Sequence, residues 1–208
     1  MNSDLIRLQY QQIASPQGRA RNLPEQPGIY AWYRDLRIGD QLYSEQSFLS
    51  AVSELLSPAL SPRLEGSLGY LYRVAVEERP IGLAEASRNS LEIISRNSSA
   101  REGMSSALVV MSQFLSPLYI GKSHSLRERV ATHVNGGSGL RQRLQQAGIR
   151  LDRCLLSFRA LDPHLIQEMA DCLVREGVDT DAANDEVLRL TEDVITRLAP
   201  ASFVRRPG

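Results

Sequence analysis

Cysteine is scarce in this chain of 208 residues, in which Cys154 and Cys172 are the only two. Neither belongs to a closely spaced pair of the kind that binds zinc, and their spacing favours two buried thiols without a disulfide, as in a reducing cytoplasm. No apolar run is long enough to cross a membrane. The segment from Met1 to Asp4 lacks the basic start of a signal peptide. We therefore expect a cytoplasmic protein that has no membrane partner.

Net charge is also lacking, because 24 lysines and arginines balance 24 aspartates and glutamates. A dedicated nucleic-acid-binding protein is usually basic, so the composition argues against strong, non-specific binding of nucleic acid. Lysine occurs once, as Lys122, in a chain that otherwise uses arginine. An ammonium group is a mobile point charge, which makes Lys122 a candidate for phosphate binding. The alternative is that Lys122 is a solvated turn residue.

The remaining composition is ordinary, with 42% hydrophobic and 23% charged residues. These values are typical of a soluble globular protein. The length fits one domain with elaborations, or one domain with a subdomain.

Residues 117–133 predict a short strand, a glycine turn and the first turns of a helix. Leu118 and Ile120 are apolar and suit a strand. Gly121 can adopt backbone angles that a side chain forbids. Ser123 or Ser125 can then cap the helix.

Four polar side chains converge where this strand ends and this helix begins. Arg129 and His133 lie four positions apart and therefore share one side of the helix, close to Tyr119 and Lys122. A helix N-terminus and cations both favour an anion, so the cluster can hold a phosphate. The alternative is that the arginine and the histidine simply face water.

A second strand is predicted at residues 28–33. Its Gly28–Tyr30 and the later Tyr119–Gly121 resemble the two signature strands of GIY-YIG nucleases. The resemblance continues through Leu126, Arg129 and His133, which match that family's pattern of a leucine, an arginine and then a histidine or tyrosine.

The resemblance implies an α+β fold, in which a small central antiparallel or mixed sheet is flanked by helices. The strands at 28–33 and 118–121 would pair antiparallel. In the family a short loop joins them, whereas here Tyr30 and Tyr119 lie 119 − 30 = 89 positions apart. We therefore expect an N-terminal helix and linker at 1–27. A nuclease domain would follow at 28–208, interrupted by a mainly helical insertion at about 36–116.

Hydrophobic periodicity predicts the other elements. Within the insertion it predicts helices at 44–56, 84–94 and 105–115, the first capped by Ser44, and a strand at 68–77 that could join the central sheet. Beyond the signature stretch it predicts helices at 140–147, 165–175 and 185–198 and a core strand at 154–161. The expected core positions of the last two helices include Met169, Val194 and Leu198.

An acidic residue near the C-terminus extends the resemblance. In the family a metal-binding glutamate precedes an apolar pair, a proline and an asparagine, and Glu192 occupies this place ahead of Pro200. Glu192 lies one position closer to the apolar pair than expected, so Asp193 or Glu186 is the alternative ligand. The asparagine is missing, and either Ser202 replaces it or its role is absent. One carboxylate with several retained waters suits Mg²⁺ or Mn²⁺.

The resemblance also implies roles in phosphodiester hydrolysis. Tyr30 would take a proton from the attacking water, although a phenol with a pKa near about 10 needs nearby cations to favour its phenolate. Lys122 and Arg129 could supply that charge and also bind the scissile phosphate. Tyr119 would orient the water or a phosphate oxygen. His133 could relay a proton, bind phosphate or itself act as the base.

Two further arginines, Arg141 and Arg143, follow a glycine-rich loop at 135–139. A basic helix beside a phosphate-handling site could follow a DNA groove and bind its backbone. An ordinary surface turn is equally consistent with this pattern.

Together these features predict a metal-dependent endonuclease that hydrolyses DNA, in restriction of foreign DNA or in repair. One alternative is a catalytically inactive module of the same fold that binds nucleic acid or another protein. The other is an unrelated α/β protein with chance motifs. With one site per chain, cutting both DNA strands would favour a homodimer or sequential nicking.

Overall fold

The computed structural model describes residues 6–14, 20, 22–56, 64–68, 72–76 and 83–198. They form an α+β fold, as expected. The chain divides into two compact units. The sheet unit comprises Met1–Arg34, Leu115–Gln145 and Arg150–Gly208, and the insertion unit comprises Asp35–Phe114 and Gln146–Ile149. The insertion predicted at about 36–116 corresponds in position to the segment Asp35–Phe114 of the insertion unit.

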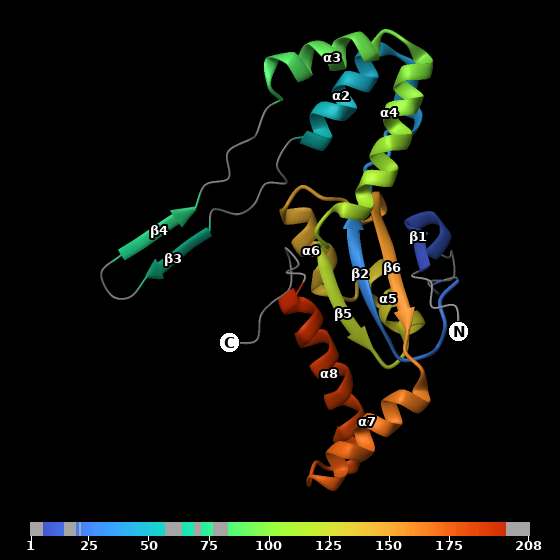
Figure 1. Cartoon of the computed structure of the whole chain (residues 1–208), viewed down its shortest axis with the longest axis vertical. Coiled ribbons are helices and arrows are strands. Elements are labelled where there is room, and N and C mark those ends of the chain that lie inside the picture. The colour runs from blue at the N-terminus through green and yellow to red at the C-terminus, as the bar shows by residue number, and fades with distance from the viewer. Residues whose placement is uncertain are drawn as a thin grey trace. The chain divides into compact units, whose positions relative to one another are not determined.

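Four strands form the centre of the sheet unit, in the order β1-β6-β2-β5 (Figure 1). They are β1 (Ile6–Gln9), β2 (Gly28–Arg34), β5 (Tyr119–Ser123) and β6 (Cys154–Ala160). Each neighbouring pair in this order is antiparallel. The predicted pairing of β2 with β5 is therefore confirmed, and the described sheet is antiparallel rather than mixed.

The N-terminal segment corrects one prediction. The prediction of a helix at the start of the chain is wrong for Ile6–Gln9. These residues form strand β1, which pairs with Leu155–Phe158 of β6. Helix α1 covers only Tyr10–Ile13. A short apolar stripe fits either a strand or a helix, and the free edge of β6 offers backbone hydrogen-bond partners that favour the strand. The segment thus belongs to the sheet.

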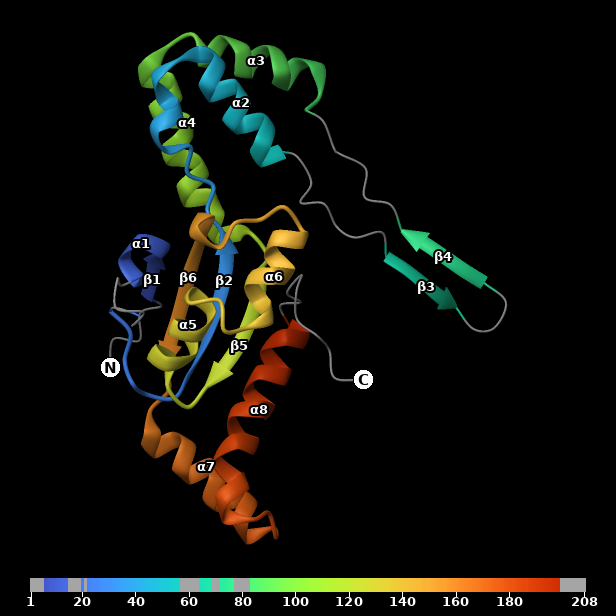
Figure 2. The same cartoon turned by 180° about the vertical axis from the view of Figure 1, so that it is seen from behind.

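Helices α5 (Leu126–Val134) and α6 (Gly139–Gln146) cover one face of this sheet (Figure 2). Ser125, one of the two predicted caps, accepts a hydrogen bond from the backbone N–H of Glu128 at the start of α5. Burial of Leu126 and Val130 then fixes α5 on the sheet. This packing holds the polar side of α5 at the edge of β5.

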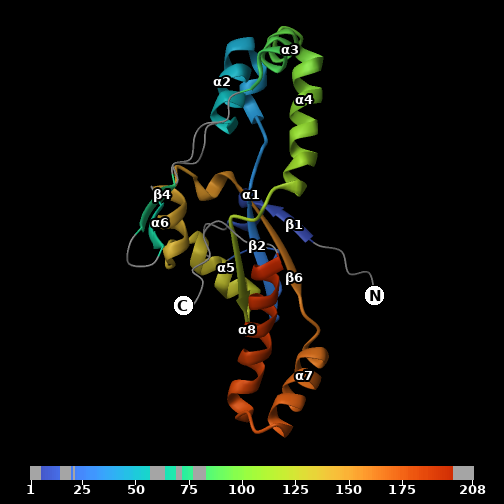
Figure 3. The same cartoon turned by 60° about the vertical axis from the view of Figure 1, so that its left-hand side comes forward.

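Helices α7 (Pro163–Arg175) and α8 (Thr180–Leu198) form a pair with its own apolar core, and α8 runs beside β5 (Figure 3). Helix α8 begins earlier than the predicted start at residue 185. The reason is a cap at Asp179, whose carboxylate accepts hydrogen bonds from the backbone N–H groups of Asp181 and Ala182.

Several positions on this helix pair contradict their predicted burial. Met169, Val194 and Leu198 are exposed, and so is Cys172, whereas Cys154 is buried as expected. Each helix buries one narrow stripe against its neighbour, so the other apolar positions face outward. Periodicity alone does not show how wide the buried stripe is.

The insertion unit is mainly helical, as expected. Ser44 caps its first α-helix, because its hydroxyl accepts a 3.1 Å hydrogen bond from the backbone N–H of Ser47. The third α-helix of the unit begins before residue 105, its predicted start. Asn97 caps this helix, because its side-chain oxygen accepts a hydrogen bond from the backbone N–H of Ala100. The elements are η1 (Gly39–Tyr43), α2 (Glu45–Leu56), α3 (Glu85–Ser95), α4 (Ser98–Met111) and η2 (Ser112–Phe114).

The strand predicted at 68–77 is present in part, as β4 (Tyr72–Val76). It pairs with β3 (Leu64–Leu68) in a separate two-stranded sheet instead of joining the central one. A partner close in sequence closes a shorter loop than a distant strand does, and this lowers the entropic cost of pairing. Residues 69–71 and 77 lie outside the described part of the chain.

Candidate active site

The register between β2 and β5 sets the position of Tyr30, which lies opposite Gly121. A Cβ atom at Gly121 would lie 2.6 Å from the hydroxyl oxygen of Tyr30 and 2.8 Å from a ring carbon of Tyr119. Both distances are shorter than the separation at which non-bonded atoms attract one another. Glycine at this position therefore allows both tyrosine rings to pack across β5.

We expect Gly121→Ala to lower the free energy of unfolding by about 2 kcal/mol, because the added methyl group must displace both rings. Urea-induced unfolding followed by circular dichroism would measure the change. Gly139→Ala is the matched control, since a Cβ there would meet nothing within 4 Å. Equal stability of the two variants would contradict this account of Gly121.

A buried chain of hydrogen bonds links Tyr30, His133 and Ser138. The Tyr30 hydroxyl lies 2.6 Å from Nε2 of His133, and the Ser138 hydroxyl lies 2.5 Å from Nδ1 of the same ring. Tyr30 and His133 are each 1% exposed. Arg129 also donates from Nε to the Tyr30 hydroxyl over 3.3 Å. Three predicted site residues are thus in contact, and Ser138 joins them from the loop between α5 and α6.

Tyr119 and Arg143 complete this cluster. The ring of Tyr119 lies with its centroid 6.0 Å from that of Tyr30 and 5.6 Å from that of His133. The guanidinium carbon of Arg143 lies 5.7 Å from the centre of the Tyr119 ring, in a cation–π arrangement. The buried Nε of Arg143 has no hydrogen-bond partner among the described residues. Arg143 therefore contacts the tyrosine cluster, which its predicted role in DNA binding did not include.

Burial keeps both Tyr30 and His133 neutral. Burial and the neighbouring Tyr119 raise the pKa of Tyr30 well above its usual value, and Arg129 opposes this rise without cancelling it. Burial, Arg129 and Arg143 lower the pKa of His133 from 6.5 to about 4. The expectation that nearby cations favour a Tyr30 phenolate is therefore wrong for the resting protein.

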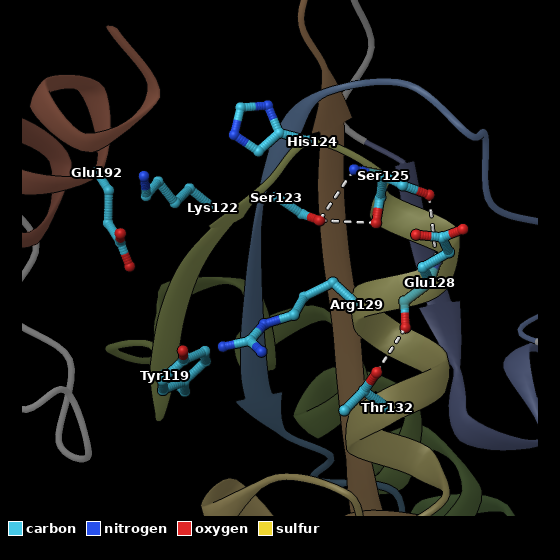
Figure 4. A pocket seen from close by; sticks show the side chains of 9 residues that line it. All are labelled: Tyr119, Lys122, Ser123, His124, Ser125, Glu128, Arg129, Thr132 and Glu192. Carbon is cyan, nitrogen blue, oxygen red and sulfur yellow. Dashed lines mark hydrogen bonds between the residues drawn. The ribbon is translucent and has the colours of Figure 1, made fainter. Parts of the chain in front are cut away.

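An open cleft of about 540 Å³ contains four of the predicted site residues (Figure 4). Tyr119 and Lys122 reach it from β5, Arg129 from α5 and Glu192 from α8, and these side chains surround the same space. The other lining residues are polar, namely Ser123, His124, Ser125, Glu128 and Thr132.

Tyr30 and His133 do not line this cleft, although the sequence predicted that one of them meets the attacking water. Both are buried, and Tyr119 and Arg129 contact them and also reach the cleft. The phenol in contact with the cleft is that of Tyr119.

Glu192 is the acid of α8 that enters the cleft. It is half-buried, and loss of solvent raises the pKa of its carboxyl group, with Lys122 and Arg129 acting in the opposite direction. The two alternatives do not line the cleft, and Glu186 is paired instead with Arg189. No cluster of three or more metal-ligating side chains occurs in the part of the chain that the structure describes. Among the described residues two carboxylates line the cleft, and only that of Glu192 is half-buried, whereas Glu128 is exposed on α5.

Lys122 forms an ion pair that its sequence position did not predict. Its ammonium group binds the carboxylate of Asp185 on α8, and also donates to the backbone carbonyl of Asp185 over 3.2 Å. His124 Nε2 lies 3.2 Å from the same carboxylate oxygen. Both Lys122 and His124 line the cleft, so the Asp185 carboxylate already binds two of its lining side chains.

Of two other predicted site residues, Arg141 does not line the cleft and Ser202 is not among the described residues. Arg141 is exposed, and it donates to the carbonyl of Val134 over 3.4 Å. Ser202, the proposed substitute for the missing asparagine, lies outside the described residues.

None of the described helices is long and apolar enough to span a membrane.

Comparison of the chain with protein-family models, with curated proteins and with solved structures found no match.

Proposed function

We propose that this protein is a metal-dependent endonuclease that hydrolyses phosphodiester bonds in DNA, with chemistry of the GIY-YIG type. The observation that carries this proposal is the meeting of two cations, one phenol and one half-buried carboxylate at a single cleft. Arg129 and Lys122 bind the scissile phosphate and stabilise the charge that grows on its oxygens during attack. Restriction of foreign DNA and DNA repair are settings in which such an activity is used.

Glu192 is the residue proposed to hold the cation. A half-buried carboxylate in an open, polar cleft fits Mg²⁺ or Mn²⁺, because such ions keep several water ligands. When bound, the ion would supply positive charge for the phosphate oxygens and help to ionise the attacking water. Burial disfavours the charged form of Glu192 in the metal-free protein. A bound cation would compensate this charge, so the burial is compatible with a role in metal binding.

Proton transfer is assigned to Tyr119, Tyr30 and His133 in that order. As the water oxygen bonds to phosphorus, its proton passes to Tyr119, the proton of Tyr119 passes to Tyr30, and that of Tyr30 passes to Nε2 of His133. The bond from phosphorus to the leaving oxygen breaks, and a second water protonates that oxygen. The hydroxide that this water leaves is neutralised by the proton that His133 returns through Tyr30 and Tyr119. The order rests on the contact of Tyr119 with the cleft, on the packing of its ring against that of Tyr30, and on the short Tyr30–His133 hydrogen bond.

Incubation with supercoiled plasmid, in Mg²⁺ or in EDTA, tests the proposal. We expect nicking that requires Mg²⁺ and falls about a hundredfold or more in Arg129→Ala, which removes a phosphate-binding charge. Tyr119→Phe should show a similar loss. Nicking that persists in EDTA or in both variants would overturn the proposal. DNA binding without cleavage of plasmid, single-stranded or branched DNA would favour the inactive module.

Asp185 competes with a phosphate for Lys122 and His124 in this interpretation. We expect Asp185→Asn to tighten binding of a short DNA duplex about two- to fivefold, because an exposed ion pair contributes up to about 1 kcal/mol. Fluorescence anisotropy in EDTA would measure binding without cleavage. Asp181→Asn on the same helix makes the same change in net charge and should have a smaller effect. Weaker binding by Asp185→Asn would indicate that Asp185 positions Lys122 and His124 instead.

A further inference from the structure

His133 is hydrogen-bonded at both ring nitrogens, on opposite sides of a buried ring. Tyr30 lies at Nε2 and Ser138 at Nδ1, at 2.6 and 2.5 Å. A neutral imidazole carries one N–H donor and one acceptor nitrogen, so only one of the two hydroxyl groups can donate to the ring. The position of the proton therefore determines whether Tyr30 can pass a proton to His133.

The chemistry of the two hydroxyl groups distinguishes the two tautomers. A phenol is far more acidic than an aliphatic alcohol, and it is therefore the better donor to a ring nitrogen. Arg129 donates to the Tyr30 oxygen, which polarises the Tyr30 hydroxyl further towards donation. The serine oxygen, whose lone pairs are not delocalised into a ring, is the better acceptor. Both preferences place the imidazole proton on Nδ1.

We propose that Ser138 is a positioning residue that holds His133 as the tautomer protonated at Nδ1, leaving Nε2 to accept the Tyr30 proton. Nδ1–H donates to the Ser138 oxygen, and the Tyr30 hydroxyl donates to Nε2. The role of this arrangement in proton transfer rests on the proposed nuclease function, whereas the tautomer itself does not. During attack Nε2 gains the Tyr30 proton, and the imidazolium keeps its Nδ1–H bond to Ser138.

The loop after α5 is built to bring Ser138 back to the histidine. Gly136 has a φ of +80°, which favours glycine over other residues. The backbone N–H of Gly137 donates to the carbonyl of Thr132 over 2.9 Å. The chain thus reverses directly after His133 and places the Ser138 side chain beside Nδ1.

Other groups around the ring act on its charge rather than on its tautomer. Tyr30 faces it from β2, Tyr119 from β5, Arg143 from α6 and Arg129 from its own helix, and both arginines disfavour the imidazolium. Apart from Tyr30, the described hydrogen-bond partner of the ring is Ser138. Removal of the Ser138 hydroxyl therefore removes the contact at Nδ1 and keeps the charges in place.

Nitrogen-15 NMR of the full chain tests the tautomer without reference to activity. The protein contains three histidines, and the His133 signals can be assigned by their loss in His133→Gln. We expect a protonated, pyrrole-type shift at Nδ1 and an unprotonated, pyridine-type shift at Nε2. In Ser138→Ala the two shifts should move towards each other as the second tautomer becomes populated. Protonation at Nε2 in the unsubstituted protein would overturn the proposal.

Plasmid-nicking kinetics test the consequence for the reaction. Ser138→Ala should lower kcat about tenfold with KM unchanged, because the partner of a catalytic histidine fixes its orientation and not the binding of substrate. Ser138→Thr keeps a hydroxyl and should restore most of kcat. Ser106→Ala, at an exposed position of α4, is the control for the substitution itself. Unchanged kcat in Ser138→Ala would overturn the positioning role.

The two readouts separate two kinds of failure. If no plasmid is cut by the unsubstituted protein, the nuclease proposal fails, while the tautomer is still decided by NMR. If plasmid is cut and Nε2 carries the proton, the nuclease proposal stands and the role of Ser138 is overturned.

Discussion

Glu192→Gln is expected to reduce Mg²⁺-dependent nicking of plasmid about a thousandfold or more, and to leave DNA binding in EDTA intact. The amide has nearly the same size as the carboxylate but carries no charge, and hard divalent cations require anionic oxygen ligands. The initial rate of nicked product, measured over a range of Mg²⁺ concentrations, gives the effect. A rate that recovers at high Mg²⁺ would indicate weakened binding of the ion, and full activity at all concentrations would contradict the role of Glu192.

The same substitution should make the metal-free protein slightly more stable. Burial raises the pKa of Glu192 above that of an unfolded glutamate. The folded state therefore holds the proton more tightly, and stability is lost as the pH rises through the unfolded and then the folded pKa. At neutral pH the ionised carboxylate costs stability, and glutamine removes that cost. Because the group is only half-buried, we expect a rise in Tm of about 1–2 °C by differential scanning fluorimetry.

Neighbouring acids provide the controls for this prediction. Glu186→Gln should keep most of the nicking activity, because Glu186 is paired with Arg189 and does not line the cleft. Asp193→Asn should also keep it, because that residue does not line the cleft. Loss of activity in Asp193→Asn with retention in Glu192→Gln would move the metal site by one residue. A variant that is both inactive and more stable distinguishes a functional carboxylate from a structural one.

Local signals in the sequence predicted much of the site. Gly28–Tyr30 and Tyr119–Gly121 identified two strands that pair in the structure, with Tyr30 opposite Gly121. Helical spacing placed Arg129 and His133 near each other, and both contact Tyr30. These predictions succeeded because each depends on backbone geometry that a few neighbouring residues determine.

The unpredicted contacts depend on distance in the sequence or on burial. Lys122 and Asp185 are 63 positions apart, so no local pattern links them. Ser138 lies in a glycine-rich loop whose path back to His133 is set by its fold and not by periodicity. The buried Tyr30 contacts His133, Arg129 and the ring of Tyr119, and these contacts form only once the sheet and α5 have packed. Motifs therefore identified the residues, and only packing showed which of them reach the cleft.

Lowering the pH from about 7.5 to about 5 is expected to cost the protein about 2 kcal/mol of unfolding free energy through His133 alone. The pKa of this histidine is 6.5 ordinarily and about 4 in the folded state, because burial and then Arg129 and Arg143 disfavour its charged form. Between these values the unfolded chain binds the proton and the folded chain does not. Stability is thus complete above the unfolded pKa and is lost as the pH falls towards 4.

Urea-induced unfolding at the two pH values would measure this effect, with His133→Gln and His164→Gln compared with the unsubstituted protein. Glutamine does not titrate in this range, so His133→Gln should lose about 2 kcal/mol of pH dependence, whatever its stability at neutral pH. His164 lies exposed on α7, so His164→Gln is the control for the substitution of a histidine itself. An identical pH dependence in all three proteins would show that His133 can be charged in the folded state. Because the proposed proton transfer makes His133 an imidazolium, this stability experiment, which involves no DNA, also measures how strongly the folded protein opposes that charge.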